Sequence, residues 1–182
     1  MIEFEVTTRI AAPPAVCFDL ARDVDFHAES LAHTGERVVD RPAQALLELG
    51  DEVEFEGRHF GVVQRHRARI TGFGAPVFFR DTMVRGAFRT FEHDHLFELV
   101  GGETVMRDRV RFTAPFGWIG WVVARIVLRP YLKRLIAQRG QEIKRAAESA
   151  AAHTPSSHFV YESATTNENR ERLTSTPPPW QR

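Results

Sequence analysis

Residues 88–112, FRTFEHDHLFELVGGETVMRDRVRF, constrain the fold most, because apolar and polar residues alternate on both sides of a Gly-Gly pair. A period of two is typical of strands with one buried face, and Gly-Gly favours a two-residue hairpin turn. With that turn, strands 87–100 and 103–114 pair Phe97 with Met106, His95 with Asp108, His93 with Val110 and Phe91 with Phe112. The apolar pairs mark the buried face, so two histidines and an aspartate are predicted to share it.

The opposite face of this hairpin is charged, with acidic residues on the first strand and arginines on the second. Opposite charges across neighbouring strands are typical of a solvated face. A pairing shifted by one residue would bury this whole charged set, so the assignment of His93, His95 and Asp108 to the inner face follows from the pattern.

Other segments show the same alternation. Residues 2–10, 52–60 and 62–70 are predicted strands. Residues 76–84 are strand-like without a clear inner face, and 36–40 is a short strand candidate. Pro13-Pro14 suits the start of a helix, and two short helices are expected to end near Leu31. In residues 62–70 the arginines alternate onto the solvent-exposed face of the strand, so Gln64 and His66 are predicted to lie on its inner face.

The period changes after Pro115, where apolar residues recur at helical spacing for about 30 residues. Pro130 is expected to kink or break this helix. Residues 1–152 are predicted to form one α+β domain, with helices on one face of an antiparallel sheet and a wedge beneath the long helix. Residues 153–182 are polar and Pro-rich, and we expect them to be a disordered tail.

Composition excludes several functions. The 24 basic and 24 acidic residues balance, so there is no overall basic footprint for nucleic acid. Cys17 is the single cysteine, which suits a reducing compartment, and the N-terminus does not read as a signal peptide. The apolar run 118–128 is too short to span a bilayer. We therefore expect a cytoplasmic protein without stable membrane insertion. Four apolar residues at the start of the long helix could pack on the sheet, form a cavity wall, or form a lip that touches a membrane during ligand transfer: Trp118, Ile119, Trp121 and Val122.

Buried polar groups are costly unless they have partners, so the inward histidines require an explanation. They could bond to one another in a filled core, or line a cavity and orient the polar end of an apolar ligand. His93, His95 and Asp108 could also be a metal triad, or His95 and Asp108 an acid/base pair. His-x-His alone is common and no further ligand follows at cupin-like spacing, so neither a metal nor a cofactor is predicted.

Several stretches resemble a known superfamily: HTGERVV, RHFGVVQRHRARIT, FFRDTMVRGAFRTFEHDHLFE and MRDRVRFTAPFGWIG. They look like the START-like helix-grip (SRPBCC) ligand-binding proteins, including members similar to polyketide cyclases and dehydrases. The resemblance covers roughly residues 1–150. It implies a curved antiparallel sheet of about seven strands wrapped around a long C-terminal helix, with two short helices after the first strand and a hydrophobic cavity inside.

We therefore expect the protein to bind, and to be able to carry, a hydrophobic or aromatic small molecule or a lipid. The predicted ligand-binding residues are Phe55, Gln64, His66, Phe91, His93, His95, Phe97, Met106, Asp108 and Phe112. One alternative is a cyclase- or dehydratase-like enzyme that uses His95 and Asp108 as its catalytic pair. The other is a regulatory module without a ligand, and no protein partner is predicted for it.

Overall fold

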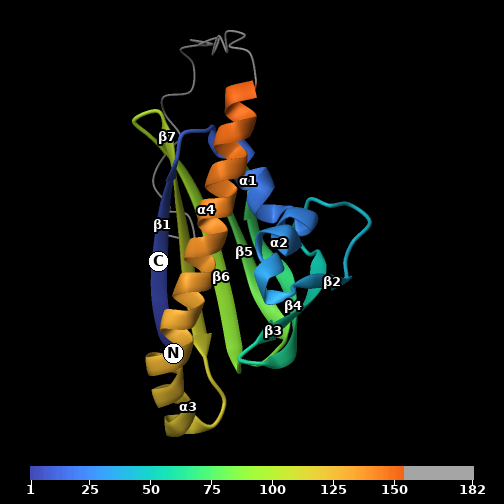
Figure 1. Cartoon of the computed structure of the whole chain (residues 1–182), viewed down its shortest axis with the longest axis vertical. Coiled ribbons are helices and arrows are strands. Elements are labelled where there is room, and N and C mark those ends of the chain that lie inside the picture. Colours follow the sequence, from blue (N-terminus) through green and yellow to red (C-terminus); the bar gives the residue numbers. More distant parts are fainter. Residues whose placement is uncertain (154–182) are drawn as a thin grey trace, which may run out of the picture.

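The computed structural model describes residues 1–153, in which seven antiparallel strands form one sheet around a long C-terminal helix (Figure 1). The strands are β1 Ile2–Ile10, β2 Arg37–Asp40, β3 Glu52–His59, β4 Val62–Gly74, β5 Phe78–Arg85, β6 Thr90–Val100 and β7 Glu103–Thr113. The helical elements are α1 Pro14–Arg22, α2 Val24–Ser30, η1 Ala32–Thr34, α3 Gly117–Val123, the π-helical η2 Ala124–Leu128 and α4 Arg129–His153. This arrangement confirms the predicted α+β helix-grip architecture.

The strand order β1-β7-β6-β5-β4-β3-β2 puts the β6–β7 hairpin between β1 and β5. The predicted β6–β7 register is confirmed, since His95 pairs with Asp108 and Phe97 pairs with Met106. On its other side β6 pairs with β5, which sets Asp81 beside His93. The two inward histidines therefore have a carboxylate-bearing strand on each side.

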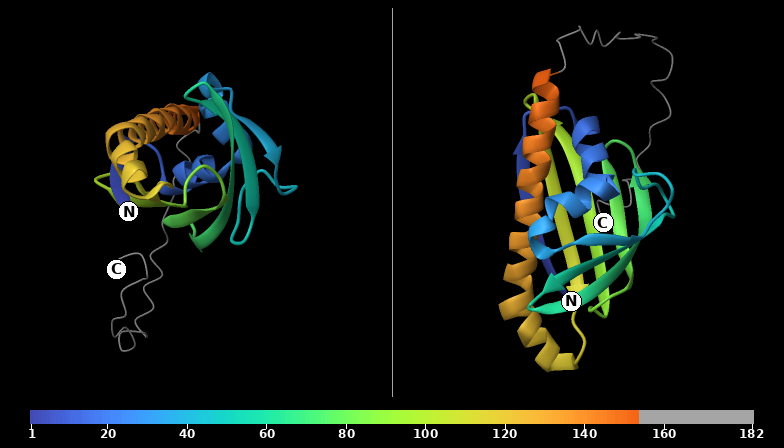
Figure 2. Two further views of the ribbon diagram at one scale, coloured as in Figure 1. Left: turned by 90° about the horizontal axis from the view of Figure 1, so that it is seen from below. Right: turned by 45° about the vertical axis from the view of Figure 1, so that its right-hand side comes forward.

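The C-terminal helical segment is continuous from Gly117 to His153, but it changes to π-helical hydrogen bonding just before Pro130, where the sequence predicted a kink or break. Pro130 is the second residue of α4, and the π-helical turn η2 lies directly before it. Proline has no backbone N–H for the helical ladder, and wider turns are a common response to such a gap. From this π-helical turn α4 runs lengthwise along the β1 side of the sheet, and α1 and α2 lie between α4 and the β2–β4 end of the sheet (Figure 2).

Two apolar clusters hold the helices to the sheet. One joins Phe18 of α1 and Ile143 of α4 to the inner face, and the other lies under η2 and contains Phe4 and Phe112. Burial of a large apolar side chain stabilises a fold by about 1.5–3 kcal/mol, so these clusters fix α4 in place. Close approach is needed as well, because a Cβ on Gly140 of α4 would lie 2.6 Å from Thr8 Oγ1 of β1.

No helix within residues 1–153 is both long enough and apolar enough to cross a membrane. His153 is the last residue of α4, and the rest of the predicted tail lies outside the residues that the structure describes.

Candidate ligand-binding site

A cavity of ≈ 270 Å³ lies between the sheet and the helices. Its wall is mainly apolar and includes residues from both apolar clusters. The apolar lining residues include Val53, Phe55, Ile70, Phe79, Phe88, Phe91, Leu128, Leu132, Leu135 and Ile136. Six of the residues predicted from the sequence line it: Phe55, Gln64, His66, Phe91, His93 and His95. The alternation in β3, β4 and β6 therefore identified one wall of the cavity.

Four predicted site residues lie elsewhere. Phe97, Met106, Asp108 and Phe112 are buried but do not line the cavity. Phe97 and Met106 are covered by the apolar cluster that contains Phe18, and Phe112 belongs to the cluster under η2. Asp108 lies behind the two histidines, on the side away from β5. All four point to the inner face as predicted, but the three apolar residues pack against the helices and Asp108 is enclosed beside the two histidines.

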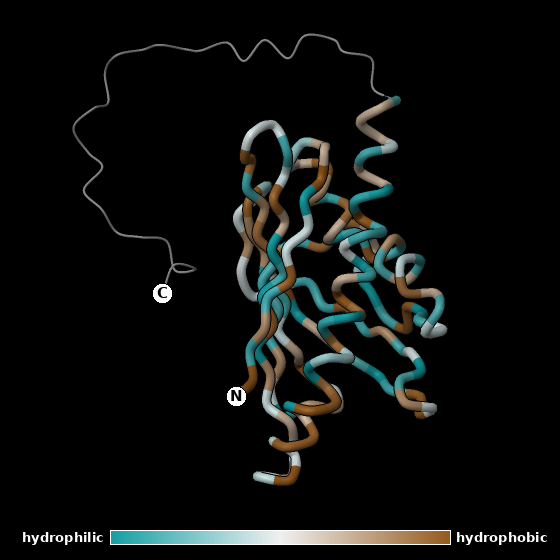
Figure 3. Tube along the Cα trace, turned by 60° about the vertical axis from the view of Figure 1, so that its left-hand side comes forward, coloured by the Kyte–Doolittle hydropathy of each residue, from teal (hydrophilic) through white to brown (hydrophobic). Residues whose placement is uncertain are grey.

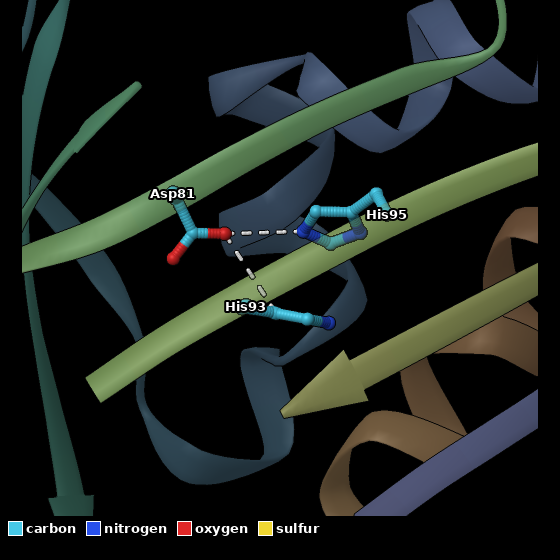
Figure 4. Close-up of side chains that lie close together, drawn as sticks. All are labelled: Asp81, His93 and His95. Carbon is cyan, nitrogen blue, oxygen red and sulfur yellow. Dashed lines mark hydrogen bonds and ion pairs between the residues drawn. The ribbon is translucent and has the colours of Figure 1, made fainter. Parts of the chain in front are cut away.

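Asp81, His93 and His95 form a compact polar cluster in the cavity wall (Figure 4). His95 Nε2 lies 3.1 Å from Asp81 Oδ2, and His93 Nδ1 lies 3.7 Å from the same oxygen. The two imidazole rings are 3.8 Å apart between centroids, and the His95 ring stacks on Phe79 at 4.1 Å. Stacking and backbone pairing hold both rings in fixed orientations.

Asp108 contacts the same two histidines from the other side. His93 Nε2 hydrogen-bonds Asp108 Oδ1 at 3.0 Å. His95 Nδ1 is 2.9 Å from that oxygen, but it is not aligned for a hydrogen bond, so the contact is electrostatic. Each imidazole is thus placed between two carboxylates, one from β5 and one from β7.

The electrostatics of this cluster favour charged carboxylates. Burial raises the pKa of Asp81, but the hydrogen bond from His95 and the nearby imidazoles outweigh it and lower that pKa to about 2. The pKa of Asp108 is also lowered, because the interactions with His93 and His95 outweigh its burial. Burial lowers the pKa of His93, and the neighbouring His95 lowers it further. The pKa of His95 is raised, since its two carboxylate partners outweigh burial.

Further polar residues line the cavity that sequence reasoning did not assign to it. His27 Nε2 is 3.1 Å from Glu36 Oε1, and the His27 ring stacks on Phe55 at 4.2 Å. His59 Nδ1 hydrogen-bonds the Tyr131 hydroxyl at 2.7 Å. His27 and Glu36 come from α2 and the segment before β2, where the sequence shows no periodicity that would reveal an inward direction.

Arg139 of α4 brings a guanidinium group to the cavity wall, although only 6% of the residue is exposed. Its Nη2 donates a hydrogen bond to the Ala21 carbonyl at 2.6 Å. Its Nε is buried without a hydrogen-bond partner, and within residues 1–153 it forms no ion pair with a carboxylate. Burial lowers the pKa of Arg139. A buried donor without an acceptor is costly, so this guanidinium group is unusual in a protein interior.

Asp81 is the main functional candidate that the sequence did not reveal. Phe78 and Phe79 precede it and are both buried, so the apolar residues of β5 do not show which side faces inward. Register shifts in the β4–β5 pairing obscure it further. The β5–β6 register shows that the Asp81 side chain faces inward, because β5 pairs Asp81 with His93 and Phe79 with His95. This register was not predictable from the sequence of β5 alone.

Comparison with solved structures identifies the same fold in proteins of low sequence identity. The di-domain ARO/CYC StfQ from the steffimycin biosynthetic pathway matches with a TM-score of 0.69 and 15% identity, over 83% of this chain and 52% of StfQ. TTHA0849 from Thermus thermophilus matches with a TM-score of 0.64 and 16% identity, over 84% of this chain and all of that one. Major latex-like protein 151 from Panax ginseng matches with a TM-score of 0.57 and 10% identity, over 80% of this chain and 97% of the ginseng protein.

The chain therefore has the helix-grip fold of START-like proteins, as the sequence resemblance implied. No family model matches the sequence. No curated protein matches it either. At these identities the similarity establishes the fold alone, and the function has to be argued from the cavity.

Proposed function

We propose that this protein binds a mainly apolar small molecule, such as a lipid or an aromatic compound, in the cavity between the sheet and α4. The observation that carries the proposal is the cavity itself, ≈ 270 Å³ in volume and lined largely by aromatic and aliphatic side chains. Enclosed apolar pockets with a few convergent polar groups are typical of small-molecule sites. A fold that only needed a core would gain stability by filling this space.

The polar wall residues would orient the ligand. His93, His95 and Asp81 lie on the sheet side, and Arg139 reaches the cavity from α4. A ligand with one oxygen-bearing end would place that end near the Arg139 Nε, whose donor has no protein acceptor. The rest of such a ligand would contact the phenylalanines and leucines, and the release of water from these apolar surfaces would supply most of the binding free energy.

An exposed apolar surface beside the cavity suggests how such a ligand enters. Its large exposed side chains are Phe116, Trp118, Ile119, Trp121, Val122, Val123, Ile126 and Val127. They belong to α3, η2 and the residue before α3, and the helix leads directly into the cavity-lining Leu128 and Tyr131. Several turns of this segment are brown in the hydropathy view (Figure 3). We call this surface the lip.

The lip has the chemistry of a surface that touches an anionic membrane. No acidic residue occurs between Asp108 and Glu142, whereas Arg125, Arg129 and Lys133 accompany the exposed tryptophans. Tryptophan and basic residues together favour the bilayer interface. Phe116 is 83% exposed and has a φ of 70°, a left-handed conformation that costs a non-glycine residue stability and is often kept for function. Transient contact with lipid would let an apolar ligand pass without crossing water.

A cavity-filling substitution tests the binding proposal. Leu135 lines the cavity, so Leu135→Trp should occupy the space and abolish binding of dodecanoic acid measured by calorimetry. Gln138→Trp adds the same side chain at an exposed position on α4 and should leave binding unchanged. Binding that survives Leu135→Trp in a folded protein would place the ligand elsewhere, and no binding of any apolar probe by the native protein would refute the proposal.

Catalysis is a second candidate function, because His95 lines the cavity, has a raised pKa and is held between Asp81 and Asp108. A protonated imidazole in this position could act as a general acid on a bound substrate. In that case His95→Gln would lower turnover of a cyclisation or dehydration substrate about 10²–10⁴-fold while binding remained. A simple binding protein would show only a modest loss of affinity with the same variant.

A further inference from the structure

We propose that Asp81, His93 and His95 form a binding site for one divalent first-row transition-metal ion in the cavity wall. The inference goes beyond the proposed ligand binding and does not depend on it. Two histidines and one carboxylate are a ligand set that divalent iron and zinc accept in proteins. The sequence suggested Asp108 as the carboxylate of such a set, whereas the structure brings Asp81 to the position that a ligand would need.

The candidate ligand atoms are already at suitable separations. One nitrogen of each imidazole and a carboxylate oxygen of Asp81 all lie within 4.8 Å of one another. The Asp81 Oδ2 distances are 3.1 Å to His95 Nε2 and 3.7 Å to His93 Nδ1. Ligands about 2.1 Å from a metal lie roughly 3.0–3.4 Å apart in octahedral or tetrahedral geometry. Small shifts in side-chain position would therefore complete the site.

Asp108 supplies the outer support that metal-binding histidines need. It accepts a hydrogen bond from His93 Nε2 at 3.0 Å and lies 2.9 Å from His95 Nδ1, a contact that is electrostatic only. A histidine that binds a metal through one nitrogen usually gives the other N–H to a carboxylate, which fixes the tautomer and the ring orientation. Asp108 is 1% exposed and does not line the cavity, as expected of a residue that supports the ligands from behind.

The charges of the cluster favour a cation. Asp81 and Asp108 bring two carboxylates into the interior, and their ion-pair partners within residues 1–153 are the two histidines alone. No arginine or lysine of this part of the chain lies within 4.0 Å of either carboxylate. By contrast, buried Asp94 on the outer face is paired with both Arg80 and Arg111. Arg139 interacts with both carboxylates only over a longer distance, so a divalent ion would supply a positive charge in direct contact with Asp81.

A metal ion bound by these three residues would keep open coordination sites. All three ligands line the cavity, and the protein supplies them from β5 and β6 on one side only. The remaining positions would face the cavity, where water or an oxygen of a bound molecule could complete the coordination sphere. Within residues 1–153 no other group of three histidine, cysteine or acidic side chains meets the same geometric requirement.

The direct test is titration of the metal-free, tag-free protein with ZnSO₄ by calorimetry, and with CoCl₂ by visible absorption. We expect one ion per chain. Asp81→Asn and His93→Gln should each remove binding, and Asp108→Asn should weaken it about 10–100-fold, as loss of an outer partner does. His33→Gln changes an exposed histidine outside the cavity and should leave the affinity unchanged. Circular dichroism establishes that each variant is folded.

A measurement on the unmodified protein keeps the test independent of folding. In ¹⁵N-labelled protein, zinc should shift the imidazole nitrogens of His93 and His95 and leave those of His27 and His59 in place. The proposal is overturned if the protein binds no zinc or cobalt at micromolar concentration. It is also overturned if folded Asp81→Asn binds as the native protein does, or if the shifts occur at other histidines.

Discussion

His95 and Asp108 lie directly opposite each other on β6 and β7, with 2.9 Å between His95 Nδ1 and Asp108 Oδ1. The same oxygen accepts the hydrogen bond of His93 Nε2. Asp108→Ala would leave His93 Nε2 without its hydrogen-bond acceptor and His95 Nδ1 without its charged neighbour. Because breaking a buried polar pair from one side is costly, we expect the free energy of unfolding to fall by about 2–4 kcal/mol. Urea denaturation of the native protein and of Asp108→Ala would measure this loss in the free energy of unfolding.

A surface pair on the same hairpin serves as the control. Arg107 and Glu98 form an ion pair at 2.8 Å, and the Glu98 side chain is 58% exposed. Glu98→Ala should change the stability by less than about 0.5 kcal/mol, as is usual for solvated pairs. If Asp108→Ala were equally mild, the buried cluster would contribute little to stability, and its arrangement would have to be explained by function alone.

The contact between Gly140 and Thr8 gives a second prediction. Gly140→Ala would place a Cβ 2.6 Å from Thr8 Oγ1, so α4 or β1 would have to move. Overpacking of this kind typically costs about 1–3 kcal/mol, which outweighs the better helix propensity of alanine. The double variant Thr8→Ala, Gly140→Ala removes the clashing oxygen and should recover part of the loss. Equal stability of the single variant and the native protein in urea would contradict the tight crossing.

Sequence periodicity predicted well which face of the sheet a side chain points to, but it predicted poorly whether that side chain lines the cavity or lies under a helix. The Gly101-Gly102 turn fixed the pairing of His95 with Asp108, and alternation put both on the inner face, as observed. The same alternation could not tell that Phe97 lies under α1 while Phe91 lines the cavity, because that depends on where the helices cross the sheet. Arg139 was missed for a related reason, since a helical pattern treats an isolated arginine as solvent-facing.

Burial of His66 predicts a pH dependence of stability. Burial lowers its pKa below the usual 6.5, so the folded protein keeps this imidazole neutral where the unfolded chain takes up a proton. Stability from this residue is complete above pH 6.5 and is lost as the pH falls through 6.5 towards the lower folded value. We expect His66→Gln to reduce the loss of stability between about pH 7.5 and about pH 5. The partly buried His27 and the buried His93, whose pKa values are also lowered, would account for part of what remains.

Urea denaturation at each pH measures this effect. His33→Gln changes an exposed histidine and should keep the profile of the native protein. A profile that is identical in the native protein and in His66→Gln would mean that water or a bound molecule solvates this imidazole in the folded state.

The unpartnered donor of Arg139 predicts selectivity for an oxygen-bearing ligand end. Arg139→Met keeps much of the side-chain volume but removes the donor, so it should weaken binding of dodecanoic acid more than binding of dodecanol. A hydrogen bond to a charged group contributes about 1.5–3 kcal/mol, which corresponds to roughly 10–100-fold in affinity. Arg134→Met, at an exposed position of α4, is the matched control. Equal losses for the acid and the alcohol would argue against a role of Arg139 in recognition.

The lip predicts binding to anionic vesicles. Trp118 and Trp121 are 77% and 50% exposed, beside Arg125 and Arg129. Changing both tryptophans to serine should reduce the affinity for phosphatidylglycerol vesicles, measured by co-sedimentation, about 100-fold or more, since each substitution removes an interfacial anchor of about 1.5 kcal/mol or more. Binding of the native protein should weaken with added salt and be lower on phosphatidylcholine, because the basic residues are attracted to the anionic lipid.

A matched control lies at the far end of the sheet, where Leu99 is 61% exposed next to the β6–β7 turn. Leu99→Ser should leave vesicle binding unchanged. Analytical ultracentrifugation of the same proteins tests the alternative that a second copy of the chain, and not a membrane, covers the lip. If the native protein forms a dimer that the tryptophan changes abolish, and does not sediment with vesicles, the lip is a self-association surface and ligand exchange must occur through water.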